Sequence, residues 1–310
     1  MVAQPPVADG LLYFDDERDA AQRLAAACGI PALPVQRHRF PDGELRLTLP
    51  VDATGRLPAR AVLLRSLHPP NDKLIELLLA ARTARSLGVH HLTLVAPYLA
   101  YMRQDIAFHP GEAVSQRIVG PFLADLFDAV VTVDPHLHRV ATLEEAVPAA
   151  QTVVVSGAPL LADWIVHQRP GALLVGPDGE SAQWVAQAAV RHGLDHAVCT
   201  KERHGDRSVT IHLPPMEVQG RAVVLLDDMA STGHTLVQAT RLLRAAGAAS
   251  VDVAVTHALI DAASLDALHA AGVGQVWSTD CVAHPTNAVA MAPALAQALG
   301  ALGLQPGEPS

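Results

Sequence analysis

Short apolar runs alternate with longer amphipathic segments along most of the chain, and this rhythm predicts its secondary structure. In the first half we expect strands at 11–14, 45–49, 61–65, 92–96 and 129–133 and helices at 17–28, 72–87 and 112–127. In the second half we expect strands at 152–155, 172–175, 222–226, 251–256 and 275–277 and helices at 159–167, 181–192, 235–246 and 262–271. Strands that alternate with helices are typical of parallel sheets. The pattern therefore predicts an α/β fold with parallel sheets flanked by helices.

The alternation runs through the chain twice and therefore predicts two similar domains. At 310 residues, half of them hydrophobic, the chain is long enough for two domains of about 150 residues, each with its own core. We expect the first domain over residues 1–147 and the second over 148–287, with a linker within 138–150. A helix at 292–302, inside the terminal segment 288–310, is expected to pack back on the first domain.

The net charge of −9 limits the kinds of molecule that we expect the chain to bind. Lys and Arg total 22 and form no block along the sequence, which argues against a nucleic-acid-binding surface. A negatively charged chain that binds phosphates must concentrate its few cations locally. Any Lys or Arg beside a phosphate-binding motif is therefore a candidate for the site.

The sequence carries no signal of secretion or of membrane insertion. Early carboxylates such as Asp9 and Asp15, and the lack of a basic segment followed by an apolar core, predict no signal peptide. The apolar stretch 288–304 contains Pro293 and Gln297 and predicts a packing helix rather than a membrane span. The 3 cysteines are far apart and indicate neither a disulfide framework nor a metal site, which favours a reducing cytoplasm.

Residues 222–235 carry the strongest chemical signal. An apolar run that ends at Leu226 predicts a buried strand, followed by Asp227 and Asp228, a turn rich in small and hydroxyl residues, and a helix. Backbone N–H groups in a turn at a helix start form a ready site for a phosphate. Carboxylates would repel that anion, so we expect the acidic pair to accept hydrogen bonds from sugar hydroxyls or to hold a metal ion. A pentose 5-phosphate fits both halves of the motif.

Three further polar clusters follow predicted strands, at residues 97–105, 134–138 and 176–179. Ligands bind beyond the carboxyl ends of the strands in open α/β sheets, so the four clusters together predict a ligand site. Taken alone, Arg103 and Asp105 could form a surface ion pair, and Asp178 could belong to an ordinary turn. The polar stretch 200–208 predicts a mobile flap, with a solvated surface loop as the alternative.

Taken together, these motifs resemble the ribose-phosphate pyrophosphokinase family, also called phosphoribosyl pyrophosphate (PRPP) synthetases, over nearly the whole chain. The matching motifs are Phe-x-Asp-Gly-Glu at 40–44, Pro-Tyr-x-x-Tyr-x-Arg-Gln-Asp at 97–105, Asp-x-His at 134–136, Pro-Asp at 177–178, Lys-x-Arg at 201–203 and the PRPP loop at 227–235. The resemblance implies two similar phosphoribosyltransferase-like domains. The first would bind ATP and the second ribose 5-phosphate.

The resemblance also implies the reaction. The 1-hydroxyl of ribose 5-phosphate attacks the β-phosphorus of MgATP, a diphosphoryl group is transferred, and AMP leaves; the PRPP would serve nucleotide biosynthesis. Such a transfer depends on alignment and on neutralisation of phosphate charge. Lys201 and Arg203, in the predicted flap, are the best candidates to neutralise the transferring group. A flap that closes would exclude water.

The remaining roles are carried over position by position from the family. The ATP contacts would come from Arg103, Gln104 and Asp105 and, at the adenine and from a neighbouring subunit, from Phe40, Asp42 and Glu44. The Mg²⁺ ligands would be His136 and Asp178, of which Asp178 is better supported because Mg²⁺ prefers oxygen. The sugar phosphate would be held by Asp227 and Asp228 at the hydroxyls and by Ser231, Thr232, Gly233 and Thr235 at the phosphate, with His234 in the same loop. Sharing of the adenine site implies a homo-oligomer, a dimer or a hexamer.

Departures from the family pattern indicate a divergent, less regulated member. His234 stands where the family usually has a glycine, and Gly179-Glu180-Ser181 replaces a glycine-rich continuation. Residues 106–110 lack the pattern of the phosphate-activated members, so activation by phosphate and inhibition by ADP are not implied.

Two other functions share part of the pattern. A phosphoribosyltransferase that consumes PRPP would explain the loop at 227–235 but neither the motif at 97–105 nor that at 40–44. A catalytically weak regulatory paralogue is disfavoured because Lys201 and Arg203 are both present.

Overall fold

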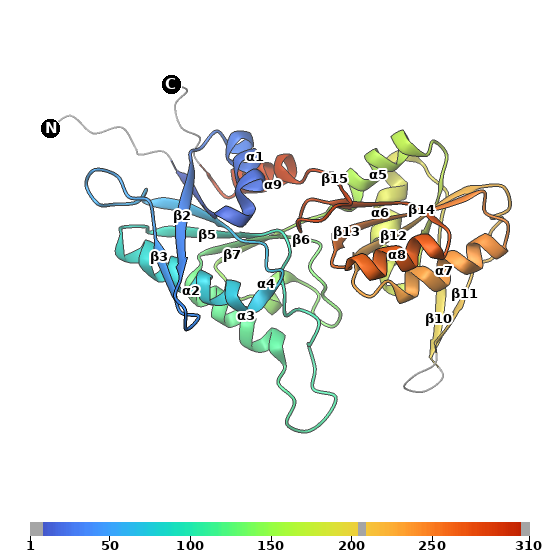
Figure 1. Cartoon of the computed structure of the whole chain (residues 1–310), viewed down its shortest axis with the longest axis horizontal. Coiled ribbons are helices and arrows are strands. Elements are labelled where there is room, and N and C mark those ends of the chain that lie inside the picture. The colour runs from blue at the N-terminus through green and yellow to red at the C-terminus, as the bar shows by residue number, and fades with distance from the viewer. Residues whose placement is uncertain (1–8, 204–208, 305–310) are drawn as a thin grey trace. The chain divides into compact units, whose positions relative to one another are not determined.

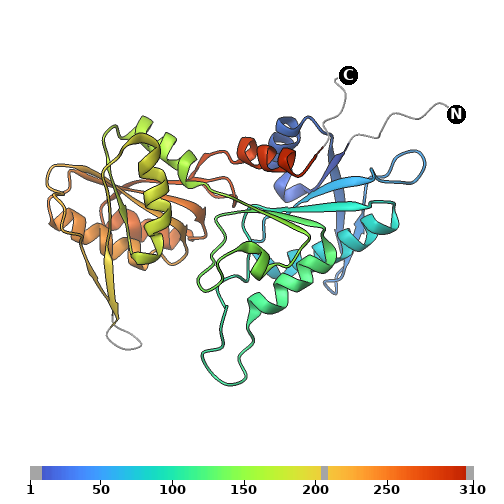
Figure 2. The same ribbon diagram turned by 180° about the vertical axis from the view of Figure 1, so that it is seen from behind.

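The computed structural model describes residues 9–203 and 209–304, with the backbone alone at 202, 203, 209 and 210. The chain forms two compact units (Figures 1 and 2), one of Met1–Val155 with Met291–Ser310 and one of Ser156–Ala290. The expected domain boundary at 147/148 precedes the strand at 151–155, which belongs to the first unit.

The first unit is built on a seven-stranded sheet of order β3-β2-β1-β4-β5-β6-β7. The strands are β1 (Gly10–Phe14), β2 (Ala32–Arg39), β3 (Leu45–Thr48), β4 (Arg60–Leu64), β5 (His91–Ala96), β6 (Ala129–Val133) and β7 (Gln151–Val155). All neighbours pair parallel except β2 and β3, which form an antiparallel hairpin. The central strands are almost wholly buried, as parallel strands covered on both faces must be.

Helices cover both faces of this sheet. The helices are the short 3-10 turn η1 (Asp15–Glu17), α1 (Arg18–Cys28), α2 (Pro70–Ser86), α3 (Ser115–Leu126), α4 (Leu143–Ala146) and α9 (Ala292–Ala301). Helices α2, α3 and α4 share one apolar core with alternate residues of the central strands. Helix α9 packs on α1 (Figure 1). Beside it, Arg60 donates a hydrogen bond to the Leu302 carbonyl at 3.3 Å.

The second unit has a six-stranded parallel sheet of order β15-β14-β13-β12-β8-β9. Its strands are β8 (Leu173–Gly176), β9 (His196–Val198), β12 (Ala222–Ala230), β13 (Ser250–Ala258), β14 (Val273–Thr279) and β15 (Asn287–Val289). A separate two-stranded antiparallel ribbon consists of β10 (Thr200–Arg203) and β11 (Val209–His212).

The second unit has two apolar cores, one on each face of its sheet. Neighbouring residues of a strand lie in different cores, because successive side chains of a strand point to opposite faces. Leu225 lies in the core beneath α7 (His234–Ala245) and α8 (Ala262–Ala270). Leu226 lies in the core beneath α5 (Ala158–Gln168) and α6 (Ala182–His192), which follows the short 3-10 turn η2 (Gly179–Ser181).

The predicted fold class is confirmed, and four local expectations need correction. The run at 45–49 is not a parallel strand but the return strand of a hairpin, whose first strand β2 is largely exposed and so lacks an apolar run. The predicted linker contains α4, because Leu143 and Val147 are buried in the first core. Strand β12 continues past Leu226 to Ala230, since β13 pairs with it as far as Ala258. The short strands β9, β10, β11 and β15 were not predicted.

Candidate functional site

The acidic pair lies on the last part of β12, in the second unit. Strand β8 pairs with β12 only as far as Leu225, so β12 leaves that neighbour before it reaches Asp227 and Asp228. Asp228 is buried, and its backbone N–H donates to the Asp227 carboxylate at 3.0 Å. The pair therefore lies on strand backbone near the carboxyl end of β12, whereas the sequence predicted it just after the strand.

Burial and, after it, charge repulsion govern the electrostatics of this pair. Burial raises the pKa of Asp227 well above its ordinary value, and the carboxylates of Asp228 and Asp178 push it in the same direction. Carboxyl groups whose charges repel in a partly dehydrated place gain from a cation or from hydroxyl donors. Oxygen donors of this kind suit Mg²⁺.

The loop that follows leads directly into a helix start. Gly233, at a φ of 70°, precedes the first residue of α7 and caps it. A left-handed backbone here favours glycine, because a Cβ would crowd the following carbonyl. Ser231 and Thr235 are half-buried, whereas Thr232 and His234 are exposed. The His234 side chain therefore replaces the family's glycine without filling the interior of the loop.

Asp178 follows β8 and caps η2. Its carboxylate accepts the Glu180 backbone N–H at 3.1 Å, and its carbonyl accepts the Ser181 hydroxyl at 2.6 Å. A Cβ on Gly176 would lie 2.2 Å from the Ser181 hydroxyl oxygen, so a larger residue there would displace that hydroxyl. The departure at 179–181 thus builds a short helical turn that holds Asp178 in place.

Lys201 lies on β10, and its ammonium is 3.6 Å from the Asp178 carboxylate. The described part of the predicted flap is an antiparallel ribbon, in which Lys201 pairs with Ile211 and Arg203 with Val209. The side chain of Arg203 and residues 204–208 lie outside what the structure describes. The ribbon thus places Lys201 beside Asp178, the carboxylate that also raises the pKa of Asp227.

In the first unit, the loop after β5 carries Arg103, Gln104 and Asp105. Arg103 is exposed, and the Gln104 amide donates to the Ile106 carbonyl at 3.0 Å. Asp105 is 3% exposed and accepts the Arg139 guanidinium at 2.7 Å and its backbone N–H at 3.2 Å. Asp105 and Arg139 thus form an ion pair. Asp105 therefore ties this loop to the segment that follows β6.

His136 lies in that same segment. Its Nε2 atom is 2.5 Å from Nε2 of His138, and the two rings meet edge to face at 4.1 Å between centroids. The preceding Asp134 has a φ of 35°, an uncommon value for a residue other than glycine. Strained backbone of this kind is often found at functional sites.

Phe40, Asp42 and Glu44 lie at the tip of the β2–β3 hairpin. Phe40 and Glu44 close the tip with a backbone hydrogen bond of 2.8 Å, and Asp42 accepts the Glu44 N–H at 3.1 Å. The Phe40 ring is 37% exposed, a large fraction for an aromatic side chain. It packs edge-on against His38, with ring centroids 4.7 Å apart.

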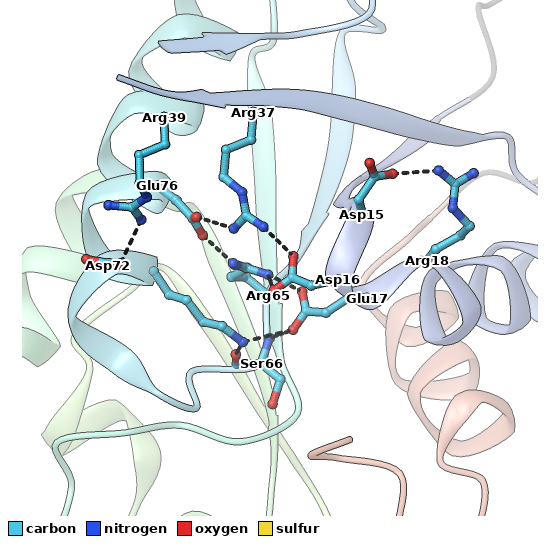
Figure 3. Close-up of polar contacts among 11 residues, drawn as sticks. Asp15, Asp16, Glu17, Arg18, Arg37, Arg39, Arg65, Ser66, Asp72 and Glu76 are labelled. Carbon is cyan, nitrogen blue, oxygen red and sulfur yellow. Dashed lines mark hydrogen bonds and ion pairs between the residues drawn. The ribbon is translucent and has the colours of Figure 1, made fainter. Parts of the chain in front are cut away.

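A buried ion-pair network, which the sequence did not predict, lies at the carboxyl ends of β1 and β4 (Figure 3). Arg65, 1% exposed, contacts Asp16 at 2.9 Å, Glu17 at 3.1 Å and Glu76, and lies over the Phe14 ring. Lys73 lies 3.5 Å from Glu17. Three cations (Arg37, Arg65 and Lys73) face three carboxylates (Asp16, Glu17 and Glu76). This end of the sheet is therefore filled by side chains of the protein that pair with one another.

Two helix-flanked, mainly parallel sheets, one of which carries an acidic pair and a glycine-capped loop, are typical of the phosphoribosyltransferase class. Residues 161–273 match the model of the phosphoribosyl transferase domain, and residues 10–126 match that of the N-terminal domain of ribose phosphate pyrophosphokinase. The chain belongs to the ribose-phosphate pyrophosphokinase family of enzymes.

Individual relatives agree with this assignment. The ribose-phosphate pyrophosphokinase of Methanopyrus kandleri is 36% identical over 90% of this chain and 94% of its own length. That of Halobacterium salinarum is 35% identical over 93% of this chain and 100% of its own. The structure of phosphoribosylpyrophosphate synthetase from Mycobacterium smegmatis shares the fold, with a TM-score of 0.79 over 96% of this chain and 99% of that chain at 23% identity. Among the described residues, none of the helices is long and apolar enough to cross a membrane.

Proposed function

We propose that this chain transfers a diphosphoryl group from MgATP to the 1-hydroxyl of ribose 5-phosphate and releases PRPP and AMP. The observation that carries the proposal is the end of β12, where Asp227 and Asp228 stand just before a glycine-capped helix start. Carboxylates can accept the ribose hydroxyls, while the N–H groups at the start of α7 can hold the 5-phosphate. Family membership and the relatives' names support the same reaction.

In this proposal the second unit holds the acceptor. Asp227 and Asp228 accept hydrogen bonds from the ribose hydroxyls, and Ser231, Thr232, Gly233, His234 and Thr235 form the loop around the phosphate. Binding fixes the sugar so that its 1-hydroxyl oxygen can form a bond to the β-phosphorus while the bond from that phosphorus to the α,β-bridging oxygen breaks. Alignment of this kind supplies much of the rate of such reactions.

Lys201 and Arg203 neutralise the transferring group. The 3.6 Å contact between Lys201 and Asp178 keeps the ammonium at the acidic edge of the second unit before the donor binds. Phosphate oxygens would compete for that ammonium, because charge-assisted contacts to phosphate are strong. A cation aimed at developing negative charge lowers the barrier.

The donor is held by the first unit. Arg103, Gln104 and Asp105 lie on the loop that Arg139 ties down, and Phe40, Asp42 and Glu44 at the hairpin tip receive the adenine of a neighbouring subunit. This sharing implies a homo-oligomer.

Asp178 and His136 are the candidate ligands of Mg²⁺, which would offset negative charge on the ATP phosphates. The raised pKa of Asp227 is consistent with a cation bound nearby. We further propose a cytoplasmic location and no nucleic-acid partner.

One product analysis tests the proposal. Protein, ATP, Mg²⁺ and ribose 5-phosphate should give AMP and PRPP in equal amounts, measured by phosphorus-31 NMR and nucleotide chromatography. ADP as the nucleotide product, or no product from folded protein, would contradict it. PRPP consumption with a purine or pyrimidine base would instead favour a phosphoribosyltransferase.

A further inference from the structure

The tip of the β2–β3 hairpin has a defined shape. The Gly43 N–H donates to the Phe40 carbonyl at 2.9 Å, and Gly43 takes a φ of 94° with open space where a Cβ would be. The turn is therefore locked by its own hydrogen bonds. The direction in which the whole tip points is set by whatever holds the hairpin to the rest of the unit.

One guanidinium joins the tip to helix α2. Arg39 donates through one nitrogen to the Gly43 carbonyl at 3.2 Å and through the other to the Asp72 carboxylate at 2.7 Å (Figure 3). A planar guanidinium with forked donors can serve two acceptors at once, which an ammonium on a flexible stem does less well. Arg39 thus couples the conformation of the turn to the start of α2.

A second contact between the hairpin and α2 lies two residues before Arg39. The two contacts together fix how β2 lies along α2. Arg37, two residues before Arg39, donates to Glu76 at 2.5 Å, and Glu76 is four residues after Asp72. Two residues of strand span about 6.6 Å and four residues of helix about 6 Å, so both pairs form together. We call these two contacts, Arg37–Glu76 and Arg39–Asp72, the hairpin ladder.

The two contacts of the ladder differ in burial. Glu76 is 0% exposed and also binds Arg65, so the lower contact is anchored in the buried network. The upper pair is open to water, with 48% of the Arg39 side chain and 69% of the Asp72 side chain exposed. Exposed ion pairs add little to folding stability. The upper contact is therefore better suited to orienting the tip than to holding the fold.

We propose that Arg39 is a positioning residue for the nucleotide, acting with Asp72 to aim Phe40, Asp42 and Glu44 at the adenine. This inference rests on the proposed function, which assigns those three residues to ATP. Arg39 itself touches no substrate; it narrows the range of tip orientations. Loss of Arg39 should weaken ATP binding while ribose 5-phosphate, held by the other unit, binds as before.

The test compares Arg39→Ala with Arg18→Ala, a matched control. Arg18 pairs with Asp15 at 2.6 Å in the same unit, and its side chain is 52% exposed. We expect Arg39→Ala to raise the KM for ATP about fivefold, which corresponds to ~1 kcal/mol. The KM for ribose 5-phosphate and the melting temperature should match those of Arg18→Ala. Arg39→Lys, which keeps the charge and loses the fork, should recover part of the effect.

A double-mutant cycle tests the partner. If Arg39 acts through Asp72, Asp72→Asn should raise the KM for ATP, and adding it to Arg39→Ala should change that KM little further. Equal rises in both KM values, a KM for ATP like that of Arg18→Ala, or full additivity would overturn the inference.

Direct ATP binding, measured by calorimetry on the same variants, separates the two proposals. Wild-type protein that binds ATP but forms no PRPP would contradict the proposed function alone. Equal ATP affinities for wild type and Arg39→Ala would contradict the positioning role alone.

Discussion

The ammonium of Lys201 lies 3.6 Å from the carboxylate of Asp178, and this contact joins the β10–β11 ribbon to the acidic edge of the second unit. The side chains are 26% and 15% exposed, so the pair is partly shielded from water. The ammonium is therefore held at the edge of the second unit where a phosphate group would bind in the proposed reaction.

Replacement of this lysine should affect turnover and not acceptor binding. We expect Lys201→Ala to lower kcat by about 10²–10³-fold, because a cation aimed at the transition state is lost. The KM for ribose 5-phosphate should change little, and Lys201→Arg should keep part of the rate. Steady-state kinetics measure both. A variant with normal kcat and weaker acceptor binding would remove Lys201 from the transferring group.

The raised pKa of Asp227 makes a prediction about stability and pH. Its folded pKa lies above the ordinary value of 3.8, so the folded state binds the proton more tightly than the unfolded state. The contribution of Asp227 to the free energy of unfolding is therefore present at low pH and is lost as the pH rises through the pKa of the folded state. Asp227→Asn should therefore melt higher than wild type at neutral pH, by about 2–4 °C for each 1 kcal/mol of repulsion removed.

The same variant should bind ribose 5-phosphate more weakly. The advantage in melting temperature should disappear below the ordinary pKa of 3.8, where Asp227 is protonated in both the folded and the unfolded state, and Mg²⁺ should narrow it at neutral pH. Thermal scans across pH, with and without Mg²⁺, give these values. A melting-temperature difference independent of pH would show that the carboxylate charge is not its cause.

Gly233 allows a test with a matched control. Gly233 and Gly171 both have a φ of 70°, and a Cβ on either would make no contact shorter than 3.7 Å. Both alanine variants should lose about 1 kcal/mol of stability from the left-handed backbone. Only Gly233→Ala should raise the KM for ribose 5-phosphate, by about tenfold, because it shifts N–H groups at the start of α7. Equal KM values for the two variants would place the phosphate elsewhere.

The ion pair of Asp105 with Arg139 should matter for the donor. Asp105→Asn keeps the shape of the side chain but weakens its contact with the guanidinium, which loosens the loop that carries Arg103 and Gln104. We expect a rise of roughly fivefold in the KM for ATP, in line with ~1 kcal/mol. Asp163→Asn, which weakens the Arg191 pair on the second unit, is the control and should leave that KM unchanged. An effect of equal size on both substrates would indicate a general loss of structure.

Local sequence patterns were enough to predict most of the strands and helices. Apolar runs such as 92–96 and 129–133 became buried parallel strands, because such strands are covered on both faces and read as continuous apolar runs. The motif at 227–235 placed an acidic pair before a helix start, and the structure has both. Family membership, predicted from the order of the motifs, is confirmed by the comparisons. The roles of the site residues stay predictions.

Only the tertiary structure decided which charges meet. Arg37 and Glu76 are 39 residues apart, and Asp105 and Arg139 are 34 apart, so no local pattern pairs them. Strand β2 was not predicted because Arg37 and Arg39 interrupt its apolar pattern. Their partners lie on α2 rather than next to them in sequence. The length of β12 was likewise set by its neighbour β13. Periodicity and turn chemistry are local and can be read from the chain, whereas ion-pair partners and strand ends depend on segments that only folding brings together.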